Sequence, residues 1–396
     1  MHLLLWGEDS EAELRSEVAE AFPGAPAGDA GPWLIASDFE MASDRSLPHL
    51  VFARQLMPHA RPVSAESVRA WAGLLLDAIA GVLPDGQPWS LQIEPHYGSR
   101  ANHRIGARAW HSRRVLNGEC RTQNEEGGRG EMRGAECGME SEEEVRQAVV
   151  DPEAGRHRCR LIREALMELM KRKRRHLLRR LRREPAGFAP EDSLVQLLLT
   201  APEAGFVSVA CAPIPFQQRH LISPFPKGEL PVASDKAAPS RAFAKLVEAE
   251  ARLGRLIGPG ETCVDLGASP GSWTYVAVNR GARVTAVDRS PLRQDLMENP
   301  LVEFRPGDAF QFKPSRPVDW LLCDVIAAPE RTAELLLEWL RRGWCRRFVV
   351  TIKLKDAERG DVLGLLKRQL PPLARDLFLM RLCANKKEAC AFGSRE

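Results

Sequence analysis

The segment from Val264 to Trp273 constrains the fold of this chain more than any other. It reads Val-Asp-Leu-Gly-Ala-Ser-Pro-Gly-Ser-Trp, so an apolar strand ends near an acid and the chain then turns through Gly267 and Gly271 into a helix. Glycine is needed where the backbone adopts a positive φ or passes close to a ligand. In doubly wound sheets, ligands bind beyond the carboxyl ends of the strands. The segment therefore predicts a strand–turn–helix unit at the edge of a ligand pocket, although a plain tight turn would use the same glycines.

The remainder of 241–396 repeats this alternation of strand and helix. Apolar runs predict strands at 262–267, 283–288, 302–305, 318–324, 347–353, 376–383 and 388–393, with helical patterns between most of them. Strands and helices that alternate at these lengths are typical of an α/β domain with helices on both faces of a mainly parallel sheet. We therefore predict a Rossmann-like, doubly wound domain.

The first 220 residues have a different pattern. Apolar runs indicate strands near 3–6, 33–36 and 89–94, helical patterns cover 11–21 and 64–82, and a strand pair follows at 194–200 and 205–213. This mixture predicts a smaller α+β domain. Residues 100–155 include the Gly-rich, polar segment 127–138 and are expected to be a loop or insertion. A proline-punctuated linker is expected at 221–240.

Residues 156–183 are the most basic part of the chain. They hold thirteen Lys and Arg against two Glu, whereas the whole chain has a formal net charge of only +3. Apolar residues at helical spacing predict one amphipathic helix with a very basic face. Such a face suits RNA phosphates, and a solvated helix surface is the alternative. A second basic patch, Arg-Arg-Gly-Trp-Cys-Arg-Arg at 341–347, combines arginines with a tryptophan that could stack on an unpaired base.

Other features limit the class of protein. The first residues carry no basic region and only a short apolar run before Glu8, so no signal peptide is predicted. The longest apolar stretch, around 71–83, is too short to span a bilayer. Nine cysteines without a C-x-x-C pair indicate reduced thiols and no zinc site. We expect a cytoplasmic protein without a membrane or metal requirement, and nothing here indicates its oligomeric state.

Acids at successive strand ends indicate the class of ligand. Asp288 ends the second predicted strand, 21 residues after Gly267, where a carboxylate can accept hydrogen bonds from ribose hydroxyls. Asp308 follows the third strand and could bind an adenine amino group; either acid alone could be a helix cap or turn residue. The dinucleotide fingerprint G-x-G-x-x-G is interrupted by Ala-Ser-Pro at 268–270. Because S-adenosylmethionine carries no phosphate and does not need that spacing, we expect it rather than NAD.

The same residues carry a family resemblance. Asp-Leu-Gly-Ala-Ser-Pro-Gly-Ser-Trp at 265–273 resembles the D-L-G-x-x-P-G-G-[WF] signature of the FtsJ-type ribose methyltransferases, and the similarity continues through 288, 308, 323–324 and 351–354. Upstream, Ser-Pro-Phe-Pro-Lys-Gly at 223–228 and Ala-Pro-Ser-Arg at 238–241 resemble the interdomain segment of the RlmM-type enzymes. Those enzymes methylate a cytidine 2'-hydroxyl of 23S rRNA and carry an amino-terminal THUMP RNA-binding domain.

The resemblance implies an S-adenosylmethionine-dependent ribose 2'-O-methyltransferase that acts on RNA, with 23S rRNA as the expected partner. It implies a THUMP-like RNA-binding region at 1–220, a linker at 221–240 and an FtsJ-type methyltransferase domain at 241–396. Another RNA substrate, such as transfer or messenger RNA, is an alternative. A non-catalytic RNA-binding factor on the same scaffold is another.

FtsJ-type enzymes use a Lys-Asp-Lys-Glu tetrad, and the resemblance assigns its positions to Lys245, Asp324, Lys353 and Glu388. A ribose hydroxyl is a poor nucleophile, so its proton must be removed as it attacks the methyl carbon. A lysine can do this only when its pKa is lowered, and a neighbouring cation or burial achieves that. We interpret Lys353 as the general base and Lys245 as the neighbouring charge, with the two acids orienting the pair.

The residues expected to bind the cofactor lie on the linker end, the glycine turn and the strand ends. They are Ser240, Asp265, Gly267, Ser269, Pro270, Gly271, Ser272, Trp273, Asp288, Asp308 and Asp324. One of them, Ser272, stands where the family signature has its second glycine, and we expect its hydroxyl to cap the following helix.

Methylation of a base is the competing reaction. Amino-group methylation favours an Asn-Pro-Pro-Tyr-like motif after the fourth strand, where this chain reads Cys-Asp-Val-Ile at 323–326. Cytosine C5 methylation needs a nucleophilic cysteine, which typically follows a proline, and Cys323 follows Leu322. Both features favour ribose methylation.

Overall fold

The computed structural model describes residues 1–7, 10–31, 34–39, 48–97, 152–182, 191–215, 218–230, 232–354, 359–384 and 387–395. Contacts between residues divide the chain into two compact units. The larger unit contains His2–Leu56 and Ile214–Glu396, and the smaller one contains Met57–Glu184 and Glu191–Pro213.

A seven-stranded sheet forms the centre of the larger unit. Its strands are β9 (Thr262–Leu266), β10 (Arg283–Asp288), β11 (Val302–Pro306), β12 (Val318–Cys323), β13 (Cys345–Lys353), β14 (Asp376–Met380) and β15 (Glu388–Ser394). They lie in the order β11-β10-β9-β12-β13-β15-β14, and β15 is antiparallel to both of its neighbours. All seven predicted strands are present, although β13 begins two residues early and β14 ends at Met380 rather than at 383. The predicted doubly wound α/β sheet is confirmed.

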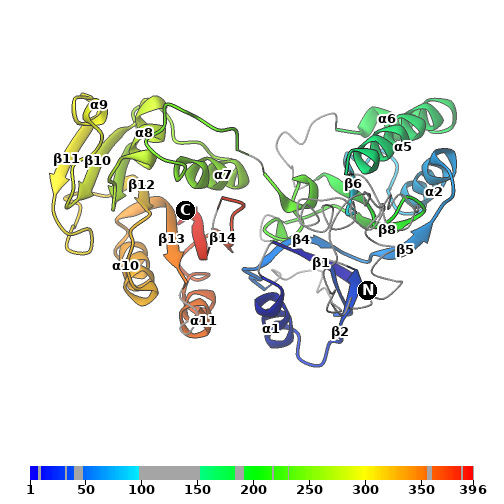
Figure 1. Cartoon of the computed structure of the whole chain (residues 1–396), viewed down its shortest axis with the longest axis horizontal. Coiled ribbons are helices and arrows are strands. Elements are labelled where there is room, and N and C mark those ends of the chain that lie inside the picture. Colours follow the sequence, from blue (N-terminus) through cyan, green and yellow to red (C-terminus); the bar gives the residue numbers. More distant parts are fainter. Residues whose placement is uncertain are drawn as a thin grey trace, which may run out of the picture. The chain divides into compact units, whose positions relative to one another are not determined.

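Helices cover both faces of this sheet. They are α7 (Phe243–Leu253), α8 (Ser272–Asn279), the short α9 (Gln294–Met297), α10 (Pro329–Arg342) and α11 (Arg359–Gln369). In Figure 1, α7 and α8 lie on one side of the strands, and α10 and α11 lie on the other. A short 3-10 helix, η3 (Pro226–Gly228), lies in the segment that precedes α7.

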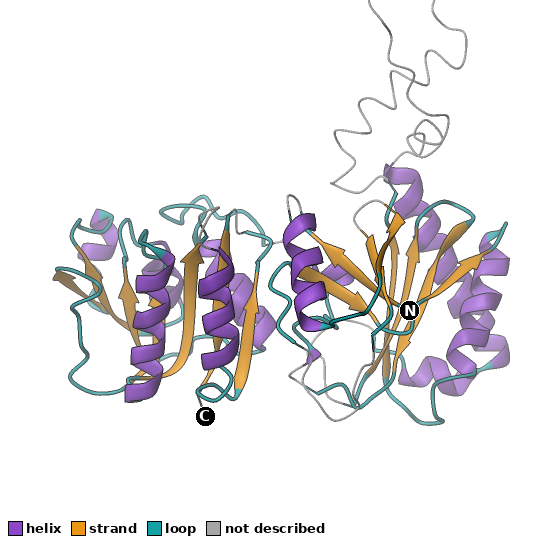
Figure 2. Ribbon diagram, turned by 90° about the horizontal axis from the view of Figure 1, so that it is seen from below, coloured by secondary structure: helices purple, strands orange, loops and turns teal. Residues whose placement is uncertain are grey.

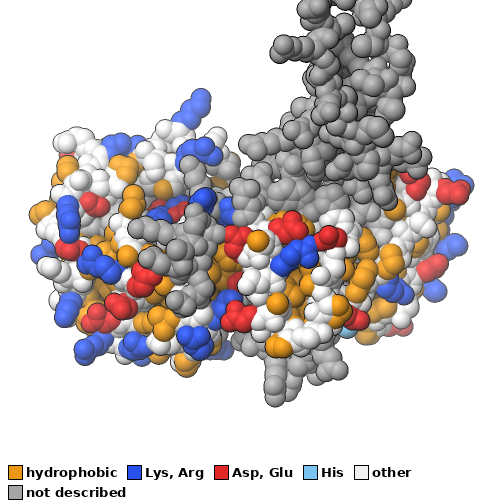
Figure 3. Space-filling view, turned by 60° about the horizontal axis from the view of Figure 1, so that its bottom comes forward, with side chains coloured by type: hydrophobic (Ala, Val, Ile, Leu, Met, Phe, Trp, Pro, Cys, Tyr) orange, Lys and Arg blue, Asp and Glu red, His pale blue; other side chains and the backbone are white. Residues whose placement is uncertain are grey.

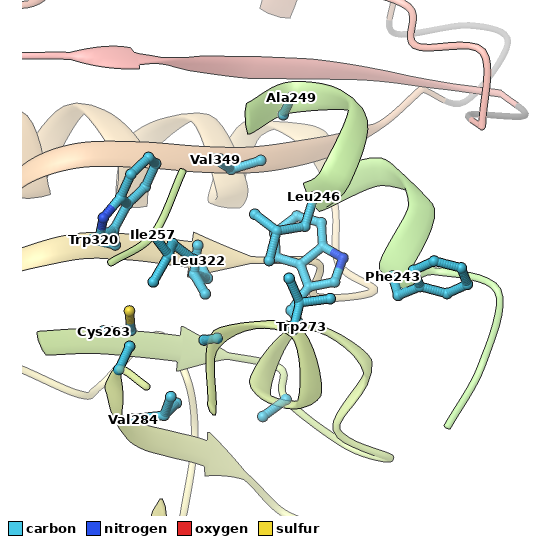
Figure 4. Close-up of a cluster of buried hydrophobic side chains, with 14 of the residues drawn as sticks. Phe243, Leu246, Ala249, Ile257, Cys263, Trp273, Val284, Trp320, Leu322 and Val349 are labelled. Carbon is cyan, nitrogen blue, oxygen red and sulfur yellow. The ribbon is translucent and has the colours of Figure 1, made fainter. Parts of the chain in front are cut away.

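The core between α7, α8 and the sheet is built from large apolar side chains. Figure 4 shows Leu246 of α7 close to Trp273 of α8, in the same cluster as Trp320, Leu322 and Val349 on β12 and β13. These five side chains are at most 2 % exposed. Burying a large apolar side chain stabilises a fold by roughly 1.5–3 kcal/mol. This packing holds α7 and the glycine turn before α8 against the strand ends.

The first residues of the chain belong to the larger unit. Strands β1 (His2–Trp6), β2 (Ala27–Gly31), β3 (Leu34–Ser37) and β4 (Ala53–Met57) form a second sheet in the order β2-β3-β1-β4, accompanied by α1 (Glu11–Ala21). The predicted domain division at residue 220 differs from this arrangement, because 2–56 make direct contacts with the last third of the chain. The backbone N–H of Arg381 donates to Val51 O at 2.8 Å, and Lys367 pairs with the buried Glu17 at 2.7 Å.

The smaller unit is an α+β structure. Its sheet has the order β5-β8-β7-β6, from β5 (Arg61–Ser64), β6 (Trp89–Pro95), β7 (Ser193–Leu199) and β8 (Ala204–Ala210). Helices α2 (Val68–Ala80) and α5 (Pro152–Lys173) share one apolar core with these strands, and the helices of this unit lie together beside the sheet in Figure 2. The helix predicted from residue 64 begins at Val68, because Ser67 caps it by accepting from the N–H of Ala70.

Two further predictions in the smaller unit need correction. The single helix predicted over 156–183 is two helices, α5 and α6 (Arg175–Arg180), because Arg174 leaves the helical region with φ −147° and ψ 55°. This break turns Leu177 into the core, where it is 3 % exposed. The loop predicted at 100–155 lies outside the described residues up to 151, and 152–155 already belong to α5. Among the described helices, none combines the length and apolar character that a membrane span requires.

Candidate active site

Topology brings four side chains to one edge of the seven-stranded sheet. Asp324 follows the last residue of β12, Lys353 ends β13, and Glu388 begins the antiparallel β15. Lys353 and Glu388 are directly paired in the register of β13 and β15. Lys245 reaches the same point from the first turn of α7. The structure therefore brings together all four residues that were predicted as a tetrad.

The four side chains form a closed set of charge-assisted hydrogen bonds. Lys353 Nζ donates to Asp324 Oδ1 at 2.6 Å and to Glu388 Oε2. Lys245 Nζ lies 3.1 Å from Asp324 Oδ2 and 2.5 Å from Glu388 Oε1. Each ammonium thus bridges both carboxylates, and the formal charges of the set cancel. Hydrogen bonds between charged groups are among the strongest in proteins and fix geometry closely.

Burial makes this arrangement unlike a surface charge cluster. The side chains of Lys245 and Glu388 are 11 % and 8 % exposed, and Lys353 is the most accessible of the four at 23 %. Surface lysines are usually solvated, so two lysines held this deeply indicate a specific role. The partial exposure of Lys353 leaves it open to an incoming substrate.

The balance of charges determines the pKa values. Burial raises the pKa of Asp324, but the ammonium groups of Lys353 and Lys245 outweigh burial and hold that pKa below its usual value. Burial lowers the pKa of Lys353, but Asp324 and Glu388 outweigh burial and raise it. The prediction that Lys245 and burial lower the pKa of Lys353 is therefore wrong for this arrangement, because two carboxylates contact Lys353 directly.

Sequence reasoning missed Thr351 as part of the site. It lies on β13 two residues before Lys353, is fully buried, and its hydroxyl donates to Asp324 Oδ1. Lys353 Nζ also lies 3.4 Å from the same hydroxyl. The alternation of side chains along a strand places residues i and i+2 on one face, which is the only sequence signal that could have identified it.

The glycine turn passes directly beside this tetrad. Gly267 has φ +74°, and a Cβ added there would lie 2.8 Å from Cα of Val325, the residue after Asp324. Gly271 has φ +109° and stands at the amino end of α8. Both positions need glycine, as predicted, because of their backbone conformation.

Two residues predicted to bind the cofactor are buried under the turn instead. Asp265 is 1 % exposed and accepts a 2.7 Å hydrogen bond from the hydroxyl of Thr274, and burial raises its pKa to about 7. Trp273 is 2 % exposed, and its indole N–H donates to Ala242 O at 2.9 Å. Their side chains support the turn and α7 rather than facing outward.

The acids at the next two strand ends are accessible. Asp288 accepts from the N–H of Ser269 at 3.1 Å and from the N–H of Ser290 at 2.9 Å, so the turn and the strand end are tied together. Asp308 accepts from the N–H of Phe310, and Arg289 pairs with it at 3.0 Å. A carboxylate offers about four lone-pair sites, so both acids keep acceptor capacity for the hydroxyl and amino groups of an adenosine.

Ser240, which lies shortly before α7, contacts Ser272, the first residue of α8. Their hydroxyl oxygens lie 2.7 Å apart, which explains why a serine is accommodated where the signature has glycine. The expected helix cap is wrong, because Ser272 is the first residue of α8 and Gly271 occupies the cap position without a side-chain bond. Ser269 and Pro270 lie in the turn itself, where the Ser269 hydroxyl donates to Pro291 O at 2.9 Å.

Two of the four arginines in the basic patch predicted at 341–347 form ion pairs with acidic residues. Arg346 pairs with Asp319 at 3.2 Å, and Arg347 pairs with Glu261 at 3.1 Å. Trp344 packs edge-on against the buried Trp339, with ring centroids 5.7 Å apart. The patch also lies at the start of β13, at the opposite end of that strand from Lys353. On the face drawn in Figure 3, basic and acidic side chains are interspersed rather than segregated.

Cytosine C5 methylation with Cys323 as the nucleophile does not suit the structure. Cys323 is fully buried, and burial raises its pKa to about 12, so it stays a thiol and cannot act as a nucleophile. Within the described residues, no three His, Cys, Asp or Glu side chains are grouped so that they could hold a metal ion.

Comparisons with known proteins give matches over much of the larger unit. Residues 238–370 match the model of the family described as FtsJ-like methyltransferase. The ribosomal RNA large subunit methyltransferase M of Thauera aminoaromatica is 37 % identical over 198 residues, which are 47 % of this chain and 54 % of that protein. The enzyme of the same name from Azotobacter vinelandii is 48 % identical over 141 residues, covering 34 % of this chain and 40 % of its own. The chain therefore matches about half the length of these relatives.

A likeness to solved structures is weak. A putative ribosomal RNA methyltransferase from Plasmodium falciparum is 17 % identical, covers 39 % of this chain and 97 % of its own, and has a TM-score of 0.32. A score of this size does not establish a shared fold, so the sequence matches carry the assignment. Residues 238–370 match the FtsJ-like methyltransferase model, and the chain is similar over part of its length to the ribosomal RNA large subunit methyltransferases M.

Proposed function

We propose that this protein is an S-adenosylmethionine-dependent methyltransferase that methylates a ribose 2'-hydroxyl of large-subunit ribosomal RNA in the cytoplasm. The observation that carries the proposal is the closed tetrad of Lys245, Asp324, Lys353 and Glu388 beside the glycine turn. The resemblance of the chain to the RlmM-type enzymes favours a cytidine of 23S rRNA as the target.

The residues around the turn fit S-adenosylmethionine, which supplies an electrophilic methyl group. Asp288 and Asp308 stand at neighbouring strand ends and keep acceptor sites for ribose hydroxyls and the adenine amino group. Gly267 and Gly271 allow the backbone to pass close to the ligand. The roles of Ser240, Ser269, Pro270 and Ser272 in cofactor binding are part of this proposal.

The tetrad would activate the 2'-hydroxyl. In the structure Lys353 is held as an ammonium by two carboxylates that raise its pKa, so it must release a proton before it can accept one from the ribose. The set then carries a net charge of −1, with the Lys245 ammonium still bridging both carboxylates. Neutral Lys353 would take the proton of the 2'-hydroxyl. S-adenosylmethionine, when bound, would supply the methyl carbon that the ribose oxygen attacks, and its carbon–sulfur bond would break to leave S-adenosylhomocysteine. Positioning the oxygen in line with the methyl carbon supplies much of the acceleration.

The experiment that tests the reaction class uses alkaline hydrolysis. Large-subunit rRNA from a strain lacking the protein is incubated with the purified chain and S-adenosylmethionine and then cleaved with mild alkali. We expect one new gap in the cleavage ladder, because a 2'-O-methyl group blocks attack on the adjacent phosphate. A methylated base without a gap would contradict ribose methylation. A gap found only in transfer RNA would show that transfer RNA, and not large-subunit rRNA, is the substrate.

We further propose that the smaller unit is a THUMP-like RNA-binding region and that α5 and α6 present its phosphate-binding face. Apolar residues such as Ile162, Leu166 and Met170 are fully buried, so the basic residues of the same helices face outward. Seven Lys and Arg residues stand in the short stretch from Lys171 to Arg180. Within the part of the chain that the structure describes, only Lys171 of these seven has an acidic partner, Glu168, at 2.5 Å. The other six charges are therefore available to an anionic ligand.

Charge reversal on this face should weaken RNA binding. The double variant Arg172→Glu/Arg179→Glu is expected to lower affinity for rRNA fragments. The slope of log K against log [salt] is negative, and its magnitude should decrease by about 1 for each phosphate that the variant no longer neutralises. Binding is measured by filter retention at several salt concentrations. Arg283→Glu, at an exposed arginine at the start of β10, changes the net charge by half as much and is the control for each single reversal, Arg172→Glu and Arg179→Glu. An equally large drop in affinity for the control, or no change in slope, would contradict the assignment.

A further inference from the structure

Helix α7 carries a buried acid, Glu248, one turn after Lys245. Its side chain is fully buried, and both of its oxygens are occupied. Oε1 accepts from Nε and Nη2 of Arg252 at 3.0 and 2.7 Å and from the N–H of Cys383 at 3.0 Å. Oε2 accepts from the N–H of Ala384 at 3.3 Å. A buried carboxylate is stable only when it is paired and hydrogen-bonded in this way.

The two backbone partners of Glu248 lie just before a tetrad residue. Cys383 and Ala384 belong to the connection between β14 and β15, and Glu388 begins β15 four residues later. Glu388 in turn contacts Lys245 on the same helix as Glu248, with 2.5 Å between Nζ and Oε1. Helix α7 therefore contacts this part of the chain at two points. Glu248 binds the backbone N–H groups of 383–384, and Lys245 binds the carboxylate of Glu388.

We propose that Glu248 is a positioning residue of the active site, which sets Glu388 at the correct distance from Lys245 and Lys353. The inference rests on the proposed function for its effect on turnover. Glu248 does not touch the tetrad itself. It acts through the backbone of 383–384, where its two carboxylate oxygens accept from two successive N–H groups.

Arg252 extends the same network to the segment that precedes α7. Its Nη2 donates to Gly228 O at 2.7 Å, and its guanidinium lies 5.6 Å from the ring centroid of Phe225. The side chains of Arg252 and Glu248 are 3 % and 0 % exposed, so truncating the Glu248 side chain would leave a cavity and remove every hydrogen bond that it accepts from the buried guanidinium. An alanine at 248 would therefore test stability rather than position.

Glu248→Gln tests the positioning role more directly than alanine does. Glutamine keeps the shape and one carbonyl oxygen for Arg252, but its NH2 group must face one of the backbone N–H donors of 383–384. We expect this connection to loosen and Glu388 to shift relative to the two lysines. Because a displacement of about 1 Å in a catalytic group can lower the rate by roughly 10²-fold, we expect kcat to fall about ten- to a hundredfold. KM for S-adenosylmethionine should stay within about twofold, because the variant leaves the strand ends at Asp288 and Asp308 intact.

Glu250→Gln is the matched control. Glu250 lies on the same helix and is equally buried, but it accepts from the N–H of Ile257 at 2.8 Å and pairs with Arg280 at 2.7 Å, and neither partner belongs to the tetrad or the β14–β15 connection. Burial raises the pKa of Glu250 to about 7, so glutamine resembles a form that is already populated at neutral pH. We expect kcat of this variant to stay within about twofold of the wild type. Equal reductions of kcat in the two variants would overturn the positioning role.

A second measurement does not depend on turnover. Amide hydrogen exchange is followed in the peptides that cover 381–390, in the full-length wild type and in both variants. We expect faster exchange in Glu248→Gln and unchanged exchange in Glu250→Gln. Unchanged exchange in Glu248→Gln would overturn the inference whether or not the protein methylates RNA. A wild type that binds S-adenosylmethionine but modifies no ribose would overturn the proposed function, and the exchange data would still decide the role of Glu248.

Discussion

Replacing Lys353 by alanine is expected to abolish detectable methyl transfer while S-adenosylmethionine still binds. A positioned general base contributes roughly 10²- to 10⁴-fold to a rate, and Lys353 is the most accessible tetrad member, in contact with both acids. The loss is measured as the single-turnover rate with labelled methyl donor, and binding is measured by calorimetry. Retained turnover in this variant would remove Lys353 from the mechanism.

Lys353→Arg separates the role of the proton from the role of the charge. Arginine can keep the contacts with Asp324 and Glu388 but cannot be deprotonated in a protein. We therefore expect the arginine variant to fold like the wild type and to be as inactive as the alanine variant. Activity above about a tenth of the wild type would show that Lys353 contributes charge alone.

The pH dependence of the wild type follows from the same geometry. Because Asp324 and Glu388 raise the pKa of Lys353, its ammonium form predominates at neutral pH in the free enzyme. The base form increases as pH rises toward that raised pKa, so kcat/KM should rise with pH through the neutral and alkaline range. A plateau that begins below about pH 7 would contradict this assignment of the base.

Gly267→Ala is the second change with a large expected effect. The position has φ +74°, where a Cβ is strained by about 1–2 kcal/mol, and the new methyl group would lie 2.8 Å from the backbone of Val325. Relief of the clash must move either the glycine turn or the chain next to Asp324. We expect a decrease of about 2–5 kcal/mol in the free energy of unfolding, together with failure to bind the cofactor or transfer its methyl group. Urea unfolding and calorimetry measure these effects.

Gly260→Ala is the control for backbone strain alone. Gly260 has φ +78°, and an added Cβ would meet nothing within 4 Å. We expect a decrease of only about 1–2 kcal/mol in the free energy of unfolding and normal binding of S-adenosylmethionine. If the two variants were destabilised equally and both bound the cofactor, the close approach of the turn to Val325 would have no functional consequence.

Much of the seven-stranded sheet could be predicted because its signals are local. Each strand appears as a short apolar run, and the residues at the ends of β10, β12 and β13 are polar or charged, so the strand ends are visible in the chain itself. Parallel strands place their carboxyl ends at one edge, so the pattern alone predicts that Asp324 and Lys353 lie close together. The glycine positions were predictable for the same reason, since φ is a property of single residues.

The directions of side chains at the turn could not be predicted from their positions in the signature. Asp265 and Trp273 occupy the expected places, but packing against Thr274, Ala242 and the core turns them inward. Ser272 pairs with Ser240 from a distant segment rather than with its own helix. A motif identifies residues that lie near a ligand. It does not distinguish the residues whose side chains face the ligand from the buried residues that support them.

The sequence by itself determined the α/β alternation and the glycine turn, because these depend on local periodicity and on the backbone conformation of single residues. Its resemblance to the FtsJ-type enzymes singled out the four residues of the proposed tetrad. Only the tertiary structure decided which charges meet. It places two carboxylates on Lys353 and so raises its pKa, it ties Glu248 to the segment before Glu388, and it joins residues 2–56 to the larger unit. Each of these features depends on contacts between residues that are far apart in the chain. Such contacts, and the electrostatic and packing energies that they contribute, exist only in the folded protein.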